Sequence, residues 1–299
     1  MDVQREDDYL RFKDRRVFEQ YSTSLGNVPK GMELDKFLSS AEEKYDFKSL
    51  RAANATSKTE SGARVAGKPN SCIEDDYLAS MLNPDGIVQI DQWIFRLDVC
   101  AGKVFVLAEK DKAMMAELKK KMPTHKAIRV FSTDDEVLDL LSTTKPGAKV
   151  AICFNDRRAD GATDQTFQRH VISSPTINTY SVEYFADAKV VYQKAGIYFS
   201  LLAELKYMRR LQDDSNWFWN QEFTSMNLLT TYRYKRRCGD ESGDSEFTFV
   251  ASDNKINKRV YESSNGLARY SLSGDFTYVA NHTSPPQSTT FRLAINDGY

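Results

Sequence analysis

The sequence is poor in the residues that build metal centres, disulfide scaffolds and phosphate-binding loops. Its 299 residues include 3 histidines, 4 cysteines and 14 glycines. No CxxC pair or zinc-type histidine motif occurs, so a zinc site is disfavoured. The glycine-rich GxGxxG and GxxxxGK[ST] loops that cradle phosphates are also missing from the sequence. We therefore predict no metal and no cofactor.

Long apolar runs and an excess of one charge are lacking as well. The longest mainly apolar run covers residues 196–203, whereas a membrane-spanning helix needs about 20 residues. No membrane-spanning segment is predicted, and the first residues do not have the pattern of a signal peptide. The 41 basic and 42 acidic residues give a net charge of −1, which disfavours nucleic acid as a partner.

The four cysteines lie far apart in the sequence. They are Cys72, Cys100, Cys153 and Cys238. An even number permits two disulfides in an oxidising compartment, and four buried free thiols are an equal alternative in a chain of this length. The cysteines therefore do not fix the compartment.

Residues 1–51 are expected to form a helical segment. Apolar side chains between residues 32 and 47 recur with the 3.6-residue period of a helix. These are Leu34, Phe37, Leu38, Ala41 and Tyr45. Another helix is expected over about residues 6–21, with the stretch 26–31 as the turn between the two. The simplest arrangement is an antiparallel helix pair.

Residues 52–70 contain no aromatic residue and one large aliphatic residue, Val65. Such a segment buries too little apolar surface to offset its ordering entropy, so we predict a flexible linker and a domain boundary.

Residues 71–170 combine helix and strand patterns and are predicted to form an α+β segment. Strand-like stretches cover residues 87–97, 104–108, 128–131 and 150–154. A hairpin is expected at Ala101-Gly102. One helix is predicted over residues 112–122, and a capping box of Thr133 and Glu136 predicts another through Leu141.

Residues 171–299 hold 21 of the 35 aromatic residues and alternate in the manner of half-buried strands. The apolar stretch 190–207 is typical of a central strand or a bent strand pair. The fold class is therefore α+β: N-terminal helices, a mixed middle segment, and a C-terminal antiparallel β-sandwich or open barrel.

The sharpest local feature is the sequence TYRYKRRCG at residues 231–239. On a strand, Tyr232 and Tyr234 point to one face, while Arg233, Lys235 and Arg237 point to the other. A basic stripe of this kind predicts contact with phosphate or another polyanion. The alternative is a strand face in water, because acidic residues are as frequent as basic ones in this part of the chain.

The tryptophans Trp217 and Trp219 in the sequence NWFWN offer flat surfaces on which a sugar ring stacks. The alternative is that they close the end of a hydrophobic core. The loop at residues 156–164 partly follows the calcium-loop pattern, but Arg158 and Phe167 occupy positions that need oxygen ligands. A solvated loop is therefore predicted there.

Five blocks together resemble a group of uncharacterised secreted or surface-associated proteins of Bacteroidetes. The blocks are EKYDFKSLR at 43–51, LNPDGIVQIDQWIFRL at 82–97, VVYQKAGIYFSLLAELKY at 190–207, RRCG at 236–239 and NKRVYESSNGLARYSL at 257–272. Asp91 stands where the group's pattern has glycine after the QI pair. The resemblance implies a cell-envelope or extracellular setting and carries over no site residue.

These observations predict a non-enzymatic binding or structural module that contacts a glycan, protein or peptide at the cell surface. One alternative is a hydrolase of glycans or peptides with loop-borne catalytic residues, and another is a polyanion-binding module. A deep pocket with a perturbed carboxylate favours the enzyme, and a flat exposed aromatic patch favours binding.

Overall fold

The computed structural model of the chain describes residues 2–29, 32–54, 72–142, 164–172, 176–177, 180–211, 217–219, 224–237, 242–243, 245–251, 255–280 and 285–299. These residues form the predicted α+β fold, with antiparallel sheets in the C-terminal half. Three expectations lie outside the described residues: most of the linker, the strand over 150–154 and nearly all of the calcium-like loop.

A six-stranded sheet occupies the N-terminal half and is called here the N-terminal sheet. Its strands, in spatial order, are β1 (Val3–Glu6), β2 (Tyr9–Phe12), β3 (Ile87–Ile90), β4 (Trp93–Asp98), β5 (Lys103–Ala108) and β6 (Ile128–Ser132). The helix expected over residues 6–21 is wrong for its first part, because β1 and β2 form a hairpin. Asp7 adopts a φ of 52° at the turn, a conformation that aspartate tolerates better than most residues.

Tight turns also divide the predicted strand over residues 87–97. β3 and β4 pair antiparallel across Asp91, which has a φ of 56°. Asp91 therefore adopts the left-handed conformation at this turn. Gly102, with a φ of 66°, makes the hairpin expected between β4 and β5.

Besides a helical stretch at residues 50–54, the described residues contain five α-helices and two 3₁₀ turns. They are α1 (Arg15–Gly26), α2 (Leu34–Glu43), α4 (Asp76–Met81), α5 (Met115–Leu118), α6 (Val137–Ser142), η1 (Val99–Ala101) and η2 (Glu109–Met114). The predicted stripe of α2 buries Leu34 and Leu38. The helix expected over residues 112–122 is much shorter, because its first half is a 3₁₀ turn kinked at Asp111.

The capping box predicted for α6 is wrong. α6 begins only at Val137, and the Glu136 carboxylate turns to other partners. It accepts hydrogen bonds from Arg237 at 2.8 Å and from the backbone N–H of Gly266 at 2.9 Å. Glu136 thus links the N-terminal half to the C-terminal sheets.

The C-terminal half contains two antiparallel sheets. The inner sheet consists of β7 (Asp164–Ile172), β8 (Thr176–Ile177), β9 (Tyr180–Lys194), β10 (Phe199–Leu211), β11 (Trp217–Trp219) and β14 (Lys255–Ser263). The outer sheet has the order β13 (Ser245–Ala251), β12 (Thr224–Arg236), β15 (Leu267–Ala280) and β16 (Gln287–Asp297). The two sheets share one tyrosine-rich core, which includes Tyr192, Tyr207, Tyr270 and Tyr278.

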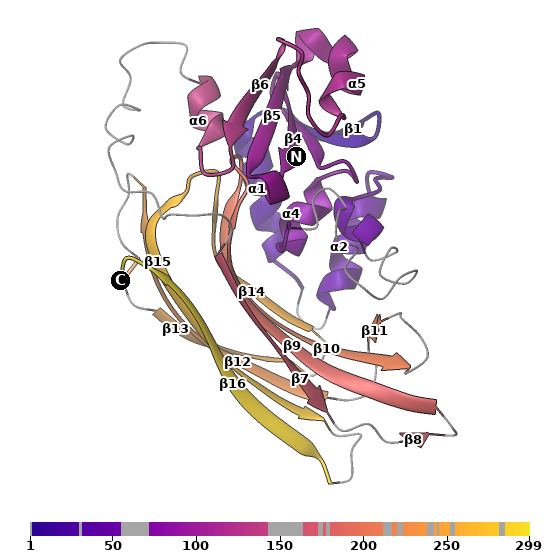
Figure 1. Cartoon of the computed structure of the whole chain (residues 1–299), viewed down its shortest axis with the longest axis vertical. Coiled ribbons are helices and arrows are strands. Elements are labelled where there is room, and N and C mark those ends of the chain that lie inside the picture. Colours follow the sequence, from indigo (N-terminus) through magenta and orange to yellow (C-terminus); the bar gives the residue numbers. More distant parts are fainter. Residues whose placement is uncertain are drawn as a thin grey trace.

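Figure 1 shows the helices α1, α2 and α4 between the N-terminal sheet and the long strands of the inner sheet. The inner sheet therefore has two different faces, one against the outer sheet and one toward the helices. We call the described residues 2–142 the N-terminal unit.

The apolar stretch 190–207 is the strand pair β9–β10, which was one of the two predicted alternatives. Its turn inserts into the core of the N-terminal unit, where Ala195, Ile197 and Tyr198 are buried. At Gly196 the φ is 73°, and a Cβ atom would lie 2.6 Å from the Cγ2 of Val104. This turn therefore packs the C-terminal half against the N-terminal unit.

Candidate functional site

Strand β12 carries the residues that the sequence singles out, and its two faces differ as predicted. Tyr232 and Tyr234 lie on the side of the shared core and are half-buried against it. Their rings stack with centroids 6.2 Å apart, and Tyr234 also contacts Tyr261 at 5.0 Å. These two tyrosines are therefore part of the core edge rather than an exposed aromatic patch.

Arg233 and Lys235 lie on the opposite, outward face of the outer sheet. The register of β12 and β15 sets Lys235 directly opposite Arg269, and Arg233 opposite Ser271. The guanidinium groups of Arg233 and Arg269 lie 4.6 and 5.1 Å from the ring centroid of Tyr299. We call Arg233, Lys235 and Arg269 the basic face.

A shallow groove of about 350 Å³ adjoins the basic face. Its lining comes from β12, β13 and β15 and consists of Thr231, Tyr232, Arg233, Ser245, Glu246 and Ser271. The groove therefore presents several hydroxyl groups, one guanidinium group and one carboxylate. Sequence patterns do not reveal Arg269 or Glu246 as neighbours of Arg233, because the register between distant strands is not written in either strand alone.

Arg237 does not belong to the basic face, contrary to the expected stripe. The ladder of β12 and β15 is irregular between Lys235 and Arg236. Arg237, beyond this irregularity, is buried and forms an ion pair with Glu136 at 2.8 Å. Its role is to join the sheets to α6.

The strand β11, which contains Trp217 and Trp219, pairs with β10 near the C-terminal end of that strand. Trp219 lies opposite Met208 in the register, and Trp217 lies opposite Arg210. The side chains of both tryptophans lie outside the described part of the chain, so their predicted stacking role stays a prediction.

The face of the inner sheet toward the helices is charged. Lys189 of β9, Glu204 of β10 and Lys255 of β14 are buried there. Lys189 contacts Glu74 at 3.0 Å and Glu204 at 3.3 Å, and Lys255 pairs with Asp76. The N-terminal unit is thus joined to the inner sheet by buried ion pairs.

These ion pairs keep the buried carboxylates ionised. Burial raises the pKa of Glu204, but the charges of Lys189, Lys206 and Lys255 outweigh this effect and lower the pKa to about 2. Asp76 is affected in the same way, and its pKa lies well below the ordinary value. A general acid needs a pKa that is raised toward neutrality, so this cluster has the character of a structural network.

The Asp75 carboxylate connects α4 to the inner sheet by accepting hydrogen bonds from uncharged donors. One carboxylate oxygen caps α4 by accepting from the N–H of Tyr77 at 2.8 Å. The other accepts from the hydroxyls of Tyr198 at 2.8 Å and Ser200 at 2.5 Å. Arg259 donates to the Tyr198 hydroxyl at 2.7 Å and lies 4.2 Å from the ring centroid of Tyr77. All these groups are engaged in holding α4 on the inner sheet.

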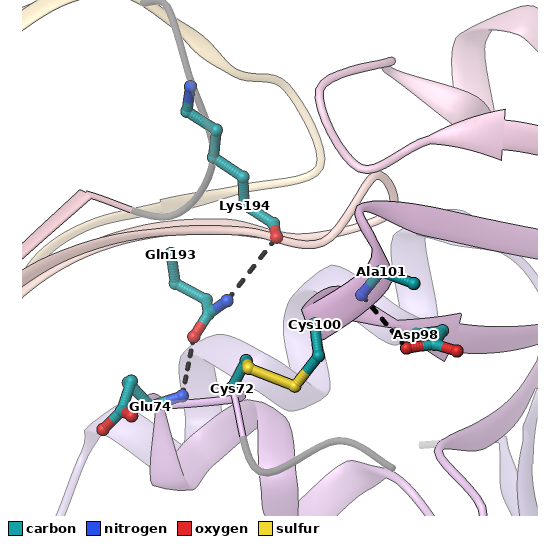
Figure 2. The surroundings of a disulfide bond; sticks show 7 residues. All are labelled: Cys72, Glu74, Asp98, Cys100, Ala101, Gln193 and Lys194. Atoms are coloured by element: carbon teal, nitrogen blue, oxygen red, sulfur yellow. Dashed lines mark hydrogen bonds between the residues drawn. A yellow bond between two sulfur atoms is a disulfide. The ribbon is translucent and has the colours of Figure 1, made fainter. Parts of the chain in front are cut away.

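Cys72 and Cys100 form a disulfide. At least these two of the four cysteines are therefore not free thiols. Figure 2 shows that this bond fixes the start of the Glu74–Asp76 segment to the 3₁₀ turn after β4. Beside it, the side-chain oxygen of Gln193 accepts a hydrogen bond from the N–H of Glu74 at 2.7 Å. Cys153 and Cys238 lie outside the described residues.

Within the described ranges, histidine, cysteine and acidic side chains form no group of three or more that could hold a metal ion. No helix in that part of the chain is long and apolar enough to cross a membrane. His125 is an exposed loop residue that accepts a hydrogen bond from the N–H of Ala127.

No protein-family model matches the chain, and no curated protein or solved structure is significantly similar to it.

Proposed function

We propose that the chain is a non-enzymatic binding or structural module that contacts a glycan, protein or peptide through the basic face and its groove. The observation that carries this proposal is the position of Lys235 directly opposite Arg269. Two cationic side chains therefore lie side by side on paired strands. An acidic group of a ligand near both of them can accept charge-assisted hydrogen bonds.

The proposed setting is the bacterial cell envelope or the extracellular space. The resemblance of five sequence blocks to secreted or surface-associated Bacteroidetes proteins supports this setting. The Cys72–Cys100 disulfide adds support, because disulfides persist mainly in oxidising compartments. The two facing sheets form a β-sandwich in this account, with the binding surface on a rigid strand ladder.

Polyanion binding is the second candidate, and the basic face favours it. The cluster differs from the predicted stripe in one member, since Arg269 takes the place that the sequence suggests for Arg237. Two guanidinium groups lie near the ring of Tyr299, and Lys235 lies opposite one of them, Arg269, on a chain whose net charge is −1. Association of this kind weakens as salt increases.

The hydrolase alternative receives no support from the described residues. The buried carboxylates Asp76 and Glu204 have lowered pKa values and are paired with lysines. The groove beside the basic face holds one carboxylate, Glu246, whereas hydrolysis of a glycan by the usual route needs two.

The proposal is tested with the purified full chain, using polygalacturonate and dextran sulfate as acidic probes and dextran as a neutral one. We expect binding to the acidic probes that decreases at least tenfold in the variant Arg233→Ala/Lys235→Ala/Arg269→Ala. The matched control is Lys110→Ala/Lys121→Ala/Lys126→Ala, which removes three exposed lysines of the N-terminal unit.

Equal binding of the acidic probes by the basic-face variant and the control contradicts the proposed site. Release of new reducing ends from polygalacturonate by the wild type, absent from a mock preparation, contradicts the non-enzymatic assignment. Thermal melting of both variants shows whether the sheet has remained folded.

A further inference from the structure

A second cavity, of about 390 Å³, lies between α1 and the turn that joins β14 to β15. It is lined by Arg15, Phe18, Glu19, Ser22, Thr23, Tyr198, Glu262, Ser263, Ser264 and Asn265. None of these residues lines the groove beside the basic face. The volume falls within the range of small-molecule sites, about 300 to 1,000 Å³, and such sites favour the junction between structural units.

Two carboxylates of this cavity each have an arginine partner within the protein. Oε1 of Glu19 accepts from Nε of Arg15 at 2.9 Å and from the Ser264 hydroxyl. Oε2 of Glu262 accepts from Ser22 at 2.8 Å and pairs with Arg259 at 2.5 Å. Glu262 thus has Arg259 as its partner, and Glu19 shares Arg15 with Asp139.

The remaining oxygen of each carboxylate, Oε2 of Glu19 and Oε1 of Glu262, makes no hydrogen bond within the described residues. An ionised carboxylate oxygen is a strong acceptor for an O–H or N–H donor. The cavity thus presents two acceptor positions that a ligand with several donors can satisfy at once.

The cation in the lining, Arg15, is already paired with carboxylates of the protein. The guanidinium of Arg15 donates to Asp139, to Asn265 at 2.8 Å and to Glu19 at 2.9 Å. An anionic ligand therefore meets two carboxylates and a cation that is already paired, which disfavours anions. Hydroxyl groups of Thr23 and Ser263 add positions that can donate or accept, and Phe18 supplies an apolar wall.

We propose that the cavity between α1 and the β14–β15 turn binds a neutral sugar, either one monosaccharide or the end residue of a neutral glycan, through hydrogen bonds from its hydroxyls to Glu19 and Glu262. This inference goes beyond the proposed function, because it concerns a different site and a ligand without charge. The ligand also touches both the N-terminal unit and the inner sheet, so its binding stabilises the contact between them.

The test uses the full chain and a panel of glucose, galactose, mannose and N-acetylglucosamine, with glucosamine and glucuronate as charged probes. Saturation-transfer NMR and thermal melting report binding. We expect at least one neutral sugar to bind in the millimolar range or tighter and to raise the melting temperature, and both charged probes to bind at least tenfold more weakly.

The variant Thr23→Trp places a large side chain in the cavity from an exposed position of α1. It should abolish sugar binding, while Glu19→Gln should weaken it about tenfold by replacing the charged acceptor. Gln20→Trp is the matched control, because Gln20 is exposed on α1 and does not line the cavity.

The proposal is overturned if no neutral sugar of the panel binds, if a charged probe binds as tightly as the neutral sugar, or if Thr23→Trp binds as Gln20→Trp does. The basic-face variant separates the two sites, since it should lose the acidic polymers and keep the neutral sugar. If the basic-face variant loses the acidic polymers and still binds the neutral sugar, the two sites are separate, as this inference requires.

Discussion

At the scale of single residues, buried charge and backbone geometry decide how the two halves of the molecule fit together. Glu204 is 2% exposed and has three lysines around it. Gly196 stands where no other side chain fits. Neither residue is distinctive in the sequence, because a glutamate in an alternating strand and a glycine between strands are both common.

Gly196→Ala should lower the free energy of unfolding by about 2 to 3 kcal/mol. The substitution combines an unfavourable positive φ with a clash against Val104 and Val137. Gly243→Ala is the control, because Gly243 has a similar φ of 69° and nothing within 4 Å. Urea denaturation measures both variants, and equal stability of the two would show that the turn is not packed as described.

Stability should also depend on Glu204 at acid pH. Its pKa is lowered from 4.5 to about 2 in the folded chain. The resulting stabilisation is fully present above pH 4.5 and is lost as the pH falls from 4.5 toward 2. The difference in melting temperature between the wild type and Glu204→Gln should therefore shrink across this range.

At neutral pH, Glu204→Gln should cost about 3 kcal/mol, because it leaves buried lysines without full compensation. The control is Glu109→Gln, whose carboxylate forms a half-exposed pair with Arg11 at 2.7 Å; this change should cost less than about 1 kcal/mol. A pH-independent difference between the wild type and Glu204→Gln would contradict the ionised state of Glu204.

At the scale of elements, the sequence predicts those helices and strands whose buried side chains recur with the period of a helix or of a strand. The stripe of α2 and the alternation of β12, β15 and β16 are read correctly from the sequence, as is the hairpin at Gly102. The hairpin β1–β2 is missed because its strands have only four residues each, too few to separate a strand from the first turns of a helix. Glu136 is misread because its distant partner Arg237 competes with the local cap.

The disulfide belongs to the same scale, since it ties the Glu74–Asp76 segment to the N-terminal sheet. Cys72→Ser/Cys100→Ser should lower the free energy of unfolding by about 2 to 4 kcal/mol. Urea denaturation under oxidising conditions measures this change. A double variant as stable as the wild type would mean that the bond contributes nothing to holding the segment in place.

At the scale of the whole molecule, the N-terminal unit and the two C-terminal sheets are joined by one apolar turn and a buried ionic network. The sequence predicts the fold class, and it predicts two of the three members of the basic face, Arg233 and Lys235. It does not predict Arg269, because strand register places that residue there. The sequence also does not predict the cavity between α1 and the β14–β15 turn, because its lining residues lie far apart in the chain.

The central claim, that the outward face of the outer sheet is the contact surface, is tested most directly by hydrogen exchange of the full chain with and without polygalacturonate. The account predicts slower exchange in β12 and β15 around residues 231–235 and 269–273, and no change in α1 or α2. Slower exchange confined to the helices, or no difference anywhere at a polymer concentration that saturates binding, would contradict it.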